Sequence, residues 1–455
     1  MKRRQFLSLA GGAAAAQLIA EAMPQRIAHA APPQPRAADH TLRIQPVALE
    51  LAPGVVIHTV GYNGKVPGPL LRLKEGVPVD IDVYNETSVP ELVHWHGLHI
   101  DSLNDGAMEE GSPMIAPHGR LRYHFTPRPS GTRWYHTHAT ANDNLSRAAY
   151  TGQFGFLYVE PKYDSGSYDQ EIFLAIHHWE PSWMHMGPPM NARDVMYRYA
   201  SFNDRLLSAA EPIRVRRGER VLFRLLNASA TESVTLALPG HHFTVLAMDG
   251  NPVPQPRSVE TLTLGVAERL DVIVAMNAPG VWVFGSADEK ERKSGLGRVI
   301  EYAGASGAPV WIDPSSTRWD YLNFASEEKQ AADAEEIQMI FASLSADAND
   351  FQHWTINGKP FPDAPSIRVK EGRRYRMVFV NSSGEPHPLH LHRHSFELVS
   401  VAGRACSGLI KDVVVIPPYS SMKADFVADN PGKTLFHCHQ QLHMDYGFMQ
   451  LIEYI

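Results

Sequence analysis

The sequence predicts an all-β fold made of three repeated domains. Three observations carry this prediction: the length of the chain, its abundance of turn residues, and two motifs that each occur three times. The chain has 455 residues, more than one hydrophobic core usually serves, so two to four domains are expected. Its 34 prolines and its 44% of apolar residues suit a loop-rich globular protein.

The first repeated motif is a turn followed by an alternating strand. In each copy a glycine stands nine residues before an asparagine, and apolar residues alternate between them. This period of two is typical of a half-buried strand. The copies are EGVPVDIDVYN (75–85), RGERVLFRLLN (217–227) and EGRRYRMVFVN (371–381).

The second repeated motif follows the first in each unit. It begins at a turn glycine and continues into a short aromatic and apolar stretch, which predicts another strand. The copies are SGTRWYHTHA (130–139), PGVWVFGSA (279–287) and PGKTLFHCHQ (431–440). Two motifs in the same order in three units indicate one fold used three times.

Histidines occupy matching positions in the first and third units. Each of these units has an H-x-H pair nine and eleven residues after the asparagine, and another five and seven residues after the second motif's glycine. The middle unit has Leu236, Leu238, Gly285 and Ala287 there. Residues i and i+2 of a strand share a face, so each pair would present two imidazoles side by side. The histidines are His94, His96, His136, His138, His390, His392, His437 and His439. Imidazole suits copper, zinc, iron and nickel, so these pairs predict a metal centre without naming the metal.

Cys438 narrows the choice of metal. It stands between two of these histidines, so its side chain should face the other side of the strand, where His387 and His443 can join it. Two histidines and a thiolate form the trigonal set of a blue-copper electron-transfer site. The corresponding residues are Glu91, Thr137 and Asp143 in the first unit and Ser233, Ser286 and Glu291 in the second. Such a site can therefore exist only in the third unit.

Four stretches resemble the copper signatures of the multicopper oxidases, in the order and spacing of three-domain laccases. They are HWHG (94–97), HTH (136–138), HPLHLH (387–392) and HCHQQLH (437–443). The resemblance spans residues 40–455. It implies three cupredoxin-like Greek-key β-sandwich domains at 40–162, 163–308 and 320–455, the second without copper.

The resemblance also implies about four copper ions per chain, one of type 1, one of type 2 and a type 3 pair. Type 1 copper would be bound by His387, Cys438 and His443, with His443 as the entry point for electrons. Type 2 copper would be bound by His94 and His390. The type 3 ligands would be His96, His136, His138, His392, His437 and His439. Four one-electron oxidations at type 1 copper would then drive the reduction of O₂ to two waters at the trinuclear cluster.

Reduction of O₂ also consumes protons, and the resemblance suggests one donor. Asp105 lies nine residues after His96, where family members have an aspartate beside the cluster. The alternative is a solvated turn residue before Gly106. Several bacterial members have a glutamate directly after the last type 1 histidine, but this chain has Met444 there, and Asp445 is not assigned as its replacement.

Phe448 stands where many family members have an axial methionine, five residues after the last type 1 histidine. A phenyl ring cannot coordinate copper, and Met449 should point to the opposite face of an extended segment. We therefore expect a three-coordinate type 1 site with a raised potential. The alternative, which is compatible with this role, is that Phe448 packs the core between domains.

One methionine-rich stretch bears on the identity of the reductant. The stretch WMHMGPPM contains Met184, His185, Met186 and Met190. Thioethers suit Cu(I), although methionine also fills gaps in irregular loops. The hypotheses are a laccase for phenols and aromatic amines, and a cuprous oxidase for metal tolerance. A copper-free structural protein of the same fold is a third, which the complete ligand sets disfavour.

The first thirty residues predict export. A basic start with Arg3 and Arg4 precedes an apolar, small-residue stretch and the A-x-A-like sequence at 28–30, which resembles a twin-arginine signal peptide. A membrane anchor is the alternative, disfavoured by the short apolar run. We expect a periplasmic or secreted monomer.

The remaining bulk properties exclude other classes. Only two cysteines are present, so no disulfide framework is expected, and Cys406 should be a small buried residue. A net charge of −7 gives no electrostatic reason to expect nucleic acid or membrane lipid as a partner.

Overall fold

The computed structural model describes residues 37–162, 166–187, 192–326 and 333–455. The predicted signal peptide and Met190 lie outside the described residues. Among the helices of the described residues, none has the length and apolarity needed to cross a membrane. The described chain consists mainly of strands, with short helical turns between them.

The first region forms a sheet with strand order β2-β1-β4-β5 and a smaller one with order β3-β7-β6. Apolar side chains from both sheets, among them Leu42, Ile81 and Leu157, share one buried core. This region also contains the 3₁₀ turns η1 (Met108–Glu110) and η2 (Ala148–Tyr150). Its strands are β1 (His40–Ala52), β2 (Val55–Tyr62), β3 (Leu71–Lys74), β4 (Val79–Asn85), β5 (Arg120–Phe125), β6 (Gly131–His136) and β7 (Phe154–Glu160).

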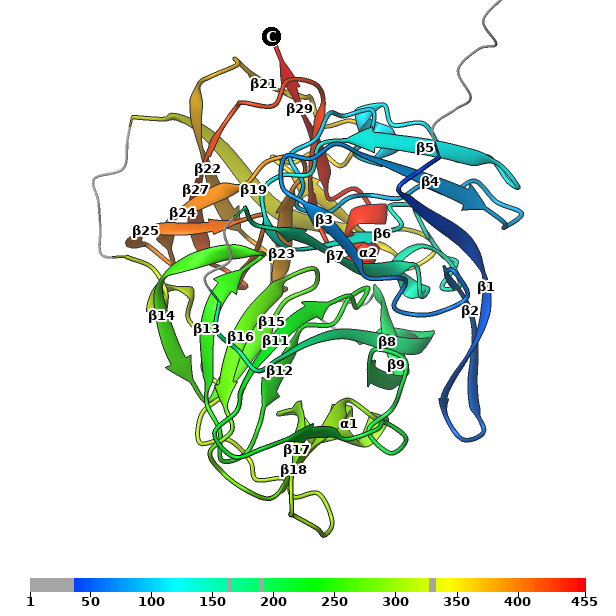
Figure 1. The fold of residues 1–455 in the computed structure, drawn as a ribbon. Coiled ribbons are helices and arrows are strands. Elements are labelled where there is room, and N and C mark those ends of the chain that lie inside the picture. The colour runs from blue at the N-terminus through cyan, green and yellow to red at the C-terminus, as the bar shows by residue number, and fades with distance from the viewer. Residues whose placement is uncertain (1–36, 163–165, 188–191, 327–332) are drawn as a thin grey trace, which may run out of the picture. The chain divides into compact units, whose positions relative to one another are not determined.

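The second region, green in Figure 1, forms sheets with the orders β14-β13-β16-β11-β8-β9 and β10-β18-β17-β12-β15. One short helix, α1 (Glu289–Ser294), follows β17. The strands are β8 (Gln170–Met186), β9 (Ala192–Phe202), β10 (Ile213–Val215), β11 (Arg220–Asn227), β12 (Val234–Ala237), β13 (Phe243–Met248), β14 (Asn251–Val259), β15 (Thr261–Leu264), β16 (Arg269–Ala275), β17 (Val281–Ser286) and β18 (Gly297–Tyr302).

The third region, yellow to red in Figure 1, forms sheets with the orders β20-β19-β22-β27-β24-β25 and β21-β29-β28-β23-β26. The turn η3 (Tyr321–Asn323) precedes it, and helix α2 (Gln441–Asp445) follows β28. The strands are β19 (Glu335–Ala346), β20 (Gln352–Ile356), β21 (Ile367–Val369), β22 (Arg374–Asn381), β23 (His387–Leu391), β24 (Phe396–Val401), β25 (Arg404–Lys411), β26 (Val413–Ile416), β27 (Ser421–Val427), β28 (Thr434–Cys438) and β29 (Met449–Tyr454).

The three regions share their strand pairing. A long first strand runs parallel to the strand of the first repeated motif in the pairs β1–β4, β8–β11 and β19–β22. A second parallel pairing recurs in β3–β7, β10–β18 and β21–β29. The predicted all-β fold is therefore confirmed, and every copy of both motifs contains a strand. The domain limits at 162, 308 and 320 stay a prediction.

The repeated asparagine fastens the loop that follows its strand. Asn85, Asn227 and Asn381 each donate from Nδ2 to a backbone carbonyl four or five residues further on, at 2.7 Å. Each also accepts, at Oδ1, the N–H two residues further on. Fixing a loop backbone in this way offsets the entropy that the loop would otherwise retain. In the third region the fastened loop carries Ser383 and Glu385, which lie beside the candidate site.

A buried ionic network joins residues of all three regions. Arg269 binds both oxygens of Asp412, at 2.7 and 2.5 Å, and Arg133 lies 3.3 Å from the same carboxylate. Lys411 pairs with Asp249 at 2.9 Å. All five side chains are fully buried. Buried charges are costly unless they are paired, so this network favours one arrangement of the three regions.

Candidate metal centres

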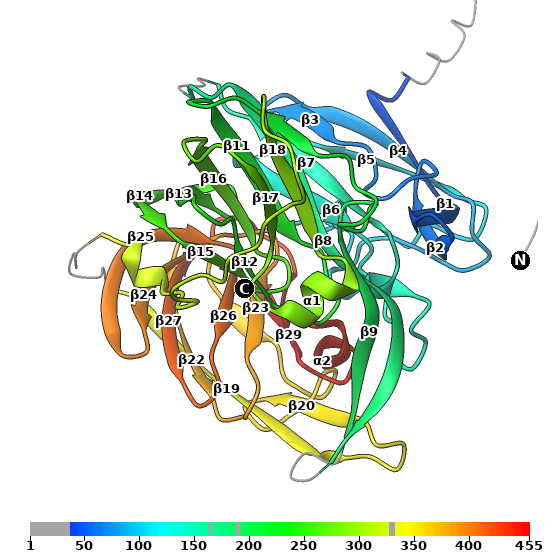
Figure 2. The same cartoon turned by 90° about the horizontal axis from the view of Figure 1, so that it is seen from below.

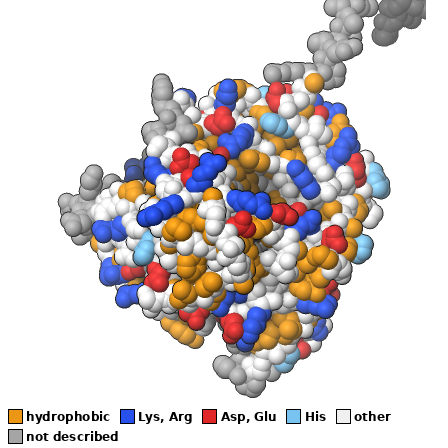
Figure 3. All heavy atoms as spheres, turned by 60° about the horizontal axis from the view of Figure 1, so that its bottom comes forward, with side chains coloured by type: hydrophobic (Ala, Val, Ile, Leu, Met, Phe, Trp, Pro, Cys, Tyr) orange, Lys and Arg blue, Asp and Glu red, His pale blue; other side chains and the backbone are white. Residues whose placement is uncertain are grey.

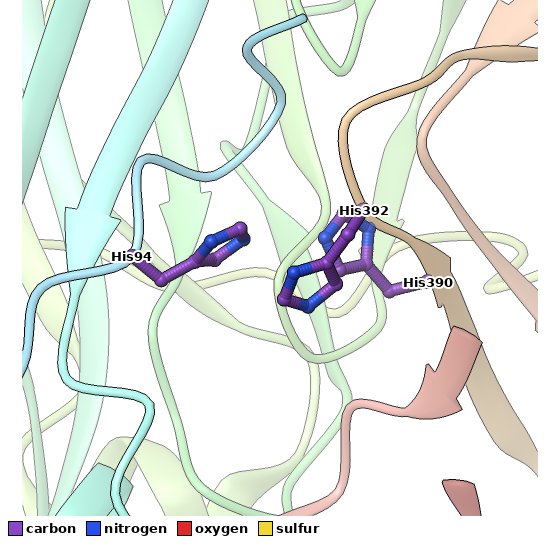
Figure 4. Close-up of side chains that lie close together, drawn as sticks. All are labelled: His94, His390 and His392. Atoms are coloured by element: carbon purple, nitrogen blue, oxygen red, sulfur yellow. The ribbon is translucent and has the colours of Figure 1, made fainter. Parts of the chain in front are cut away.

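The eight predicted histidines converge, although they come from opposite ends of the chain. Figure 4 shows the ring of His94 pointing toward the rings of His390 and His392, which come from the third region. Ring nitrogens of these three lie within 4.8 Å of one another, as do those of His138, His392 and His437. All eight side chains are buried. The structure therefore brings together the whole histidine set that the sequence predicted.

The expected strand geometry is wrong for the first H-x-H pair. His94 forms only an isolated bridge with His136, and His96 lies in a turn. The turn is closed by a hydrogen bond from Leu98 N–H to the carbonyl of Trp95 at 3.2 Å. Two backbone hydrogen bonds, at 2.8 and 3.1 Å, make the bridge. The bridge and the turn, rather than a continuous strand, hold this pair.

Several of the histidines use one ring nitrogen for the protein and leave the other without a partner. Nδ1 of His94 donates to the carbonyl of Asp105 at 2.9 Å, Nδ1 of His390 donates to that of Asp412 at 2.7 Å, and Nδ1 of His136 donates to that of Thr137. The Nε2 atoms of these three histidines are buried without a hydrogen-bond partner. Buried polar atoms are rarely left so, and a metal-ligating histidine has this arrangement.

Other ring nitrogens in the cluster face each other directly. Nε2 of His437 lies 3.0 Å from Nε2 of His392 and 3.4 Å from Nε2 of His138. Burial lowers the pKa of His138 and of His390 to about 3, and at His390 it outweighs the opposing charge of Asp412. The rings are therefore neutral, as coordination requires. Facing neutral nitrogens in a buried cluster fit a bound transition-metal ion.

Asp105 lies beside two histidines of this cluster, one from the first region and one from the third. Its Oδ2 is 2.8 Å from Nδ1 of His392 and 3.1 Å from Nδ1 of His94, and its side chain is fully buried. The alternative of a solvated turn residue is therefore wrong. A carboxylate here accepts the ring N–H groups and fixes which nitrogen of each ring is free.

Two carboxyl groups at the cluster were not predicted. Glu110 lies 3.4 Å from Nδ1 of His392, and Asp412 lies 3.0 Å from Nε2 of His96. Burial and then the charge of Asp105 raise the pKa of Glu110. Burial opposes charge on Asp412 too, but the Arg269 guanidinium lowers its pKa. In the sequence, Glu110 and Asp412 are recognisable only as polar residues. Their role depends on partners that lie far away in the chain.

The predicted thiolate site is also assembled. Sγ of Cys438 lies 3.5 Å from Nδ1 of His443 and 3.8 Å from Nδ1 of His387, and these two nitrogens are 3.1 Å apart. The other ring nitrogen of His387 lies 2.8 Å from Ser383 Oγ, and that of His443 lies 3.0 Å from Glu385 Oε2. Two imidazoles and one sulfur converge on one point, which is the donor set of a blue-copper site.

Comparison with known proteins identifies the family of this chain. Three sequence families, each described as multicopper oxidase, match residues 44–164, 185–300 and 336–454. Multicopper oxidase MmcO of Mycobacterium tuberculosis is 30% identical over 94% of this chain and 89% of its own. The chain belongs to the multicopper oxidase family. It is therefore an oxidoreductase that uses copper as cofactor and O₂ as electron acceptor.

Other relatives include enzymes with different names. Laccase-2 of Botryotinia fuckeliana is 26% identical, over 86% of this chain and 78% of its own. The crystal structure of a multicopper oxidase from Pseudomonas thermotolerans superposes with a TM-score of 0.73 at 26% identity, covering 92% of this chain and 100% of that one. The likeness to multicopper oxidase structures confirms the predicted cupredoxin-like sandwich fold.

Phe448 packs against the predicted blue-copper site of this multicopper oxidase. Its ring centroid lies 4.8 Å from that of His387 and 5.0 Å from that of Phe341, and its side chain is fully buried. Met449 packs instead in a separate buried cluster that includes Met444. The prediction that Met449 faces away from Phe448 is confirmed.

Asp445 and Cys406, to which the sequence assigned no catalytic role, both make hydrogen bonds. Asp445 accepts hydrogen bonds from the backbone N–H groups of Ala141 and Asn142, at 2.9 and 2.8 Å. Burial raises its pKa to about 7. Cys406 is a buried free thiol, as predicted, and donates to the carbonyl of Leu398.

His443 lines a small cavity together with residues of the β8–β9 hairpin. Met186 and Asp194 form part of its wall, and Glu385 and Trp354 complete the side toward the third region. Glu385 and Trp354 also line an adjoining cleft of about 860 Å³. His443 therefore faces a small cavity next to a larger cleft, at the edge of the predicted blue-copper site.

Proposed function

We propose that this multicopper oxidase is a laccase-type enzyme that takes single electrons from phenols and aromatic amines at His443. The observation that carries this proposal is the open cleft beside the His443–Glu385 pair. His443 Nε2–H donates to Glu385, whose side chain is 24% exposed and can also accept the proton that a phenol loses on oxidation. Trp354 offers an aromatic wall to the donor, with its ring centroid 4.1 Å from that of His443.

The donor sets support about four coppers per chain, which together supply one-electron oxidation of donors and four-electron reduction of O₂. His387, Cys438 and His443 would hold the type 1 ion. The eight histidines of the H-x-H pairs would hold the other three, with His94 and His390 at type 2. Cys438 lies between His437 and His439, so ligands of the two centres are directly adjacent in the chain. The proposed proton relay is Asp105, whose Oδ2 contacts His94 of the first region and His392 of the third.

A cuprous oxidase is the second candidate, favoured by Met186 and Asp194 in the cavity wall. A thioether beside His443 suits a soft cation such as Cu(I), and the carboxylates add negative charge that attracts a cation. Met184 is exposed and stands opposite Asp194 in the hairpin, so it could deliver Cu(I) to the cavity.

Oxygen uptake with a simple phenol and with Cu(I), each with and without added Cu(II), distinguishes the two functions. A laccase should oxidise the phenol without added Cu(II). Replacing Met184 and Met186 by leucine should then leave both activities nearly unchanged, as should the control Met196→Leu. If the double variant loses Cu(I) oxidation selectively while the control keeps it, the second function is the correct one.

We further propose that residues 1–30 are a twin-arginine signal peptide and that the mature protein is a periplasmic or secreted monomer. The Arg3–Arg4 pair and the A-x-A-like sequence at 28–30 support export. Separately, the face in Figure 3 mixes acidic, basic and apolar side chains, which is compatible with an enzyme that acts on small molecules. Replacing both arginines by lysine should retain the protein in the cytoplasm with its leader uncleaved. Export unaffected by this change would contradict the proposed route.

A further inference from the structure

The copper-free second region has its own version of the corner that holds the thiolate in the third region. Ser286 is the last residue of β17, as Cys438 is the last residue of β28. Glu291 is the third residue of α1, as His443 is the third residue of α2. In both regions the last strand residue pairs with the neighbouring strand, in β12–β17 and in β23–β28. The fold therefore places Ser286 and Glu291 where the third region has two metal ligands.

Polar side chains surround this corner, and the ring of Tyr197 packs against His178 with its centroid 5.2 Å away. Ser286 Oγ donates to Glu291 Oε2 at 2.5 Å, and Thr231 Oγ1 donates to Glu232 Oε1 at 2.9 Å. His178, on β8, places Nε2 3.5 Å from Glu291 Oε1. Glu232 interacts electrostatically with both His178 and Glu291, and burial raises the pKa of its carboxyl. Figure 2 shows α1 beside β9, the partner strand of β8.

The surroundings of His178 indicate that this residue binds a cation. Its side chain is only 4% exposed, and neither ring nitrogen makes a hydrogen bond. The 3.5 Å approach to Glu291 falls outside hydrogen-bond geometry. Leaving a buried imidazole unsatisfied beside carboxylates costs free energy, which a bound cation would offset. The histidines of the H-x-H pairs show the same kind of unpaired ring nitrogen.

We propose that His178, Glu232 and Glu291 bind one divalent cation of the zinc type. One neutral imidazole with two carboxylates suits Zn²⁺, whereas Ca²⁺ prefers more oxygen ligands and Cu(I) prefers sulfur. Ser286 positions Glu291 through its hydroxyl group. The side chain of Glu291 is 21% exposed, so the ion has a path to solvent.

The cation would connect three separate elements, one of which ends at the cavity beside His443. His178 lies on β8, Glu291 on α1, and Glu232 in the loop between β11 and β12. Strand β8 ends at Met186, in the wall of the cavity beside His443. A cation at this corner therefore stabilises the base of the hairpin that forms part of that wall.

The test uses the copper-loaded protein, so that zinc does not enter empty copper sites. After dialysis against Zn²⁺ and removal of loosely bound ions, we expect about one zinc per chain in addition to copper. His178→Ala and the nearly isosteric Glu291→Gln should lose this zinc while keeping their copper and their blue absorption. His242→Ala, at an exposed histidine of the same region, is the matched control and should keep it. Copper content and colour in the same samples test the oxidase assignment separately.

Thermal unfolding provides the second measurement. Zinc should raise the midpoint of the wild type and of H242A, because a ligand that binds only the folded state stabilises it, and it should leave H178A and E291Q unchanged. Calcium should not replace zinc in this effect. Equal zinc content in the wild type and H178A would overturn the proposal. So would equal destabilisation of both variants with zinc and with a chelator, because His178 and Glu291 would then form an ion pair only.

Discussion

The second and third regions use one corner of the same sandwich for different chemistry. In the third region Cys438 and two histidines meet there, with the rings of Trp354 and Phe448 packed against His387. In the second region Ser286 and Glu291 take the equivalent places, among further polar groups. The fold supplies the position, and the local side chains decide whether a copper ion at a thiolate or the proposed zinc-type ion at carboxylates fits. The two corners differ mainly in sulfur content and in polarity.

The strongest way to break this comparison is to convert one corner into the other. Cys438→Ser gives the third region the residue that the second region has as Ser286. A hydroxyl group is neither soft nor deprotonated at neutral pH, so type 1 copper should be lost. We expect a colourless protein without oxidase activity, measured by visible absorption and oxygen uptake. A C438S variant that consumes O₂ at the normal rate would contradict the assignment of Cys438.

The second region also acts on the third through charge. Replacing Arg269 by methionine leaves the buried Asp412 with Arg133, at 3.3 Å, as its remaining guanidinium partner. Loss of one partner of a buried ion pair costs about 3 to 5 kcal/mol of unfolding free energy. The exposed pair of Arg198 and Glu180 is the control, since R198M should cost about 1 kcal/mol or less. Denaturant unfolding of both variants measures the difference.

The Arg269–Asp412 pair should also appear in the pH dependence of stability. The pKa of Asp412 is lowered in the folded protein, so its contribution is complete above the ordinary aspartate pKa of about 4. The contribution is lost as the pH falls toward the lowered folded value. R269M should therefore show a weaker loss of stability in acid than the wild type. Parallel curves for the two proteins would mean that this pair does not couple to protonation.

A fourth prediction separates the blue-copper site from the histidine cluster that the first and third regions share. Asp105→Ala should slow O₂ reduction by about a hundredfold, the lower range for loss of an acid–base group. Reduction of the blue centre by substrate should hardly change, because the His387–Cys438–His443 site does not include Asp105. Anaerobic bleaching and aerobic recovery of the blue band time the two steps separately. The exposed Asp101→Ala is the control, and equal slowing of both steps in D105A would indicate copper loss or misfolding.

The parts that the sequence predicted correctly depend on local spacing. The strand repeats, the H-x-H pairs and the alternation that separates Cys438 from its neighbours are all encoded within a few residues. The contact between His96 and Asp412 joins residues 316 positions apart, and no local pattern announces it. Glu110, Glu385 and the proposed cation ligand His178 were missed for the same reason.

Local context also explains why the strand expected at His94 does not form. It likewise determines the different surroundings of Met184 and Met186. The bridge to His136 and the following turn replace the expected strand at His94. Met184 is exposed, while Met186 lines the cavity beside His443, so two residues of one type on one strand have different surroundings.

The smallest expected effect concerns Phe448, which contributes to the apolar character of the third corner. Its ring packs against His387, Phe341 and Trp354 in the core, so it both fills space and excludes water from the blue-copper site. Phe448→Met keeps nearly the same volume, so the fold should tolerate it. A thioether near the copper would donate electron density and stabilise Cu(II), which lowers the reduction potential. The wild type should therefore have the higher potential in redox titrations of the blue band, and Phe448→Leu, which fills space without a sulfur atom, should stay close to the wild type. An unchanged or higher potential in F448M would show that residue 448 is not axial and serves packing alone.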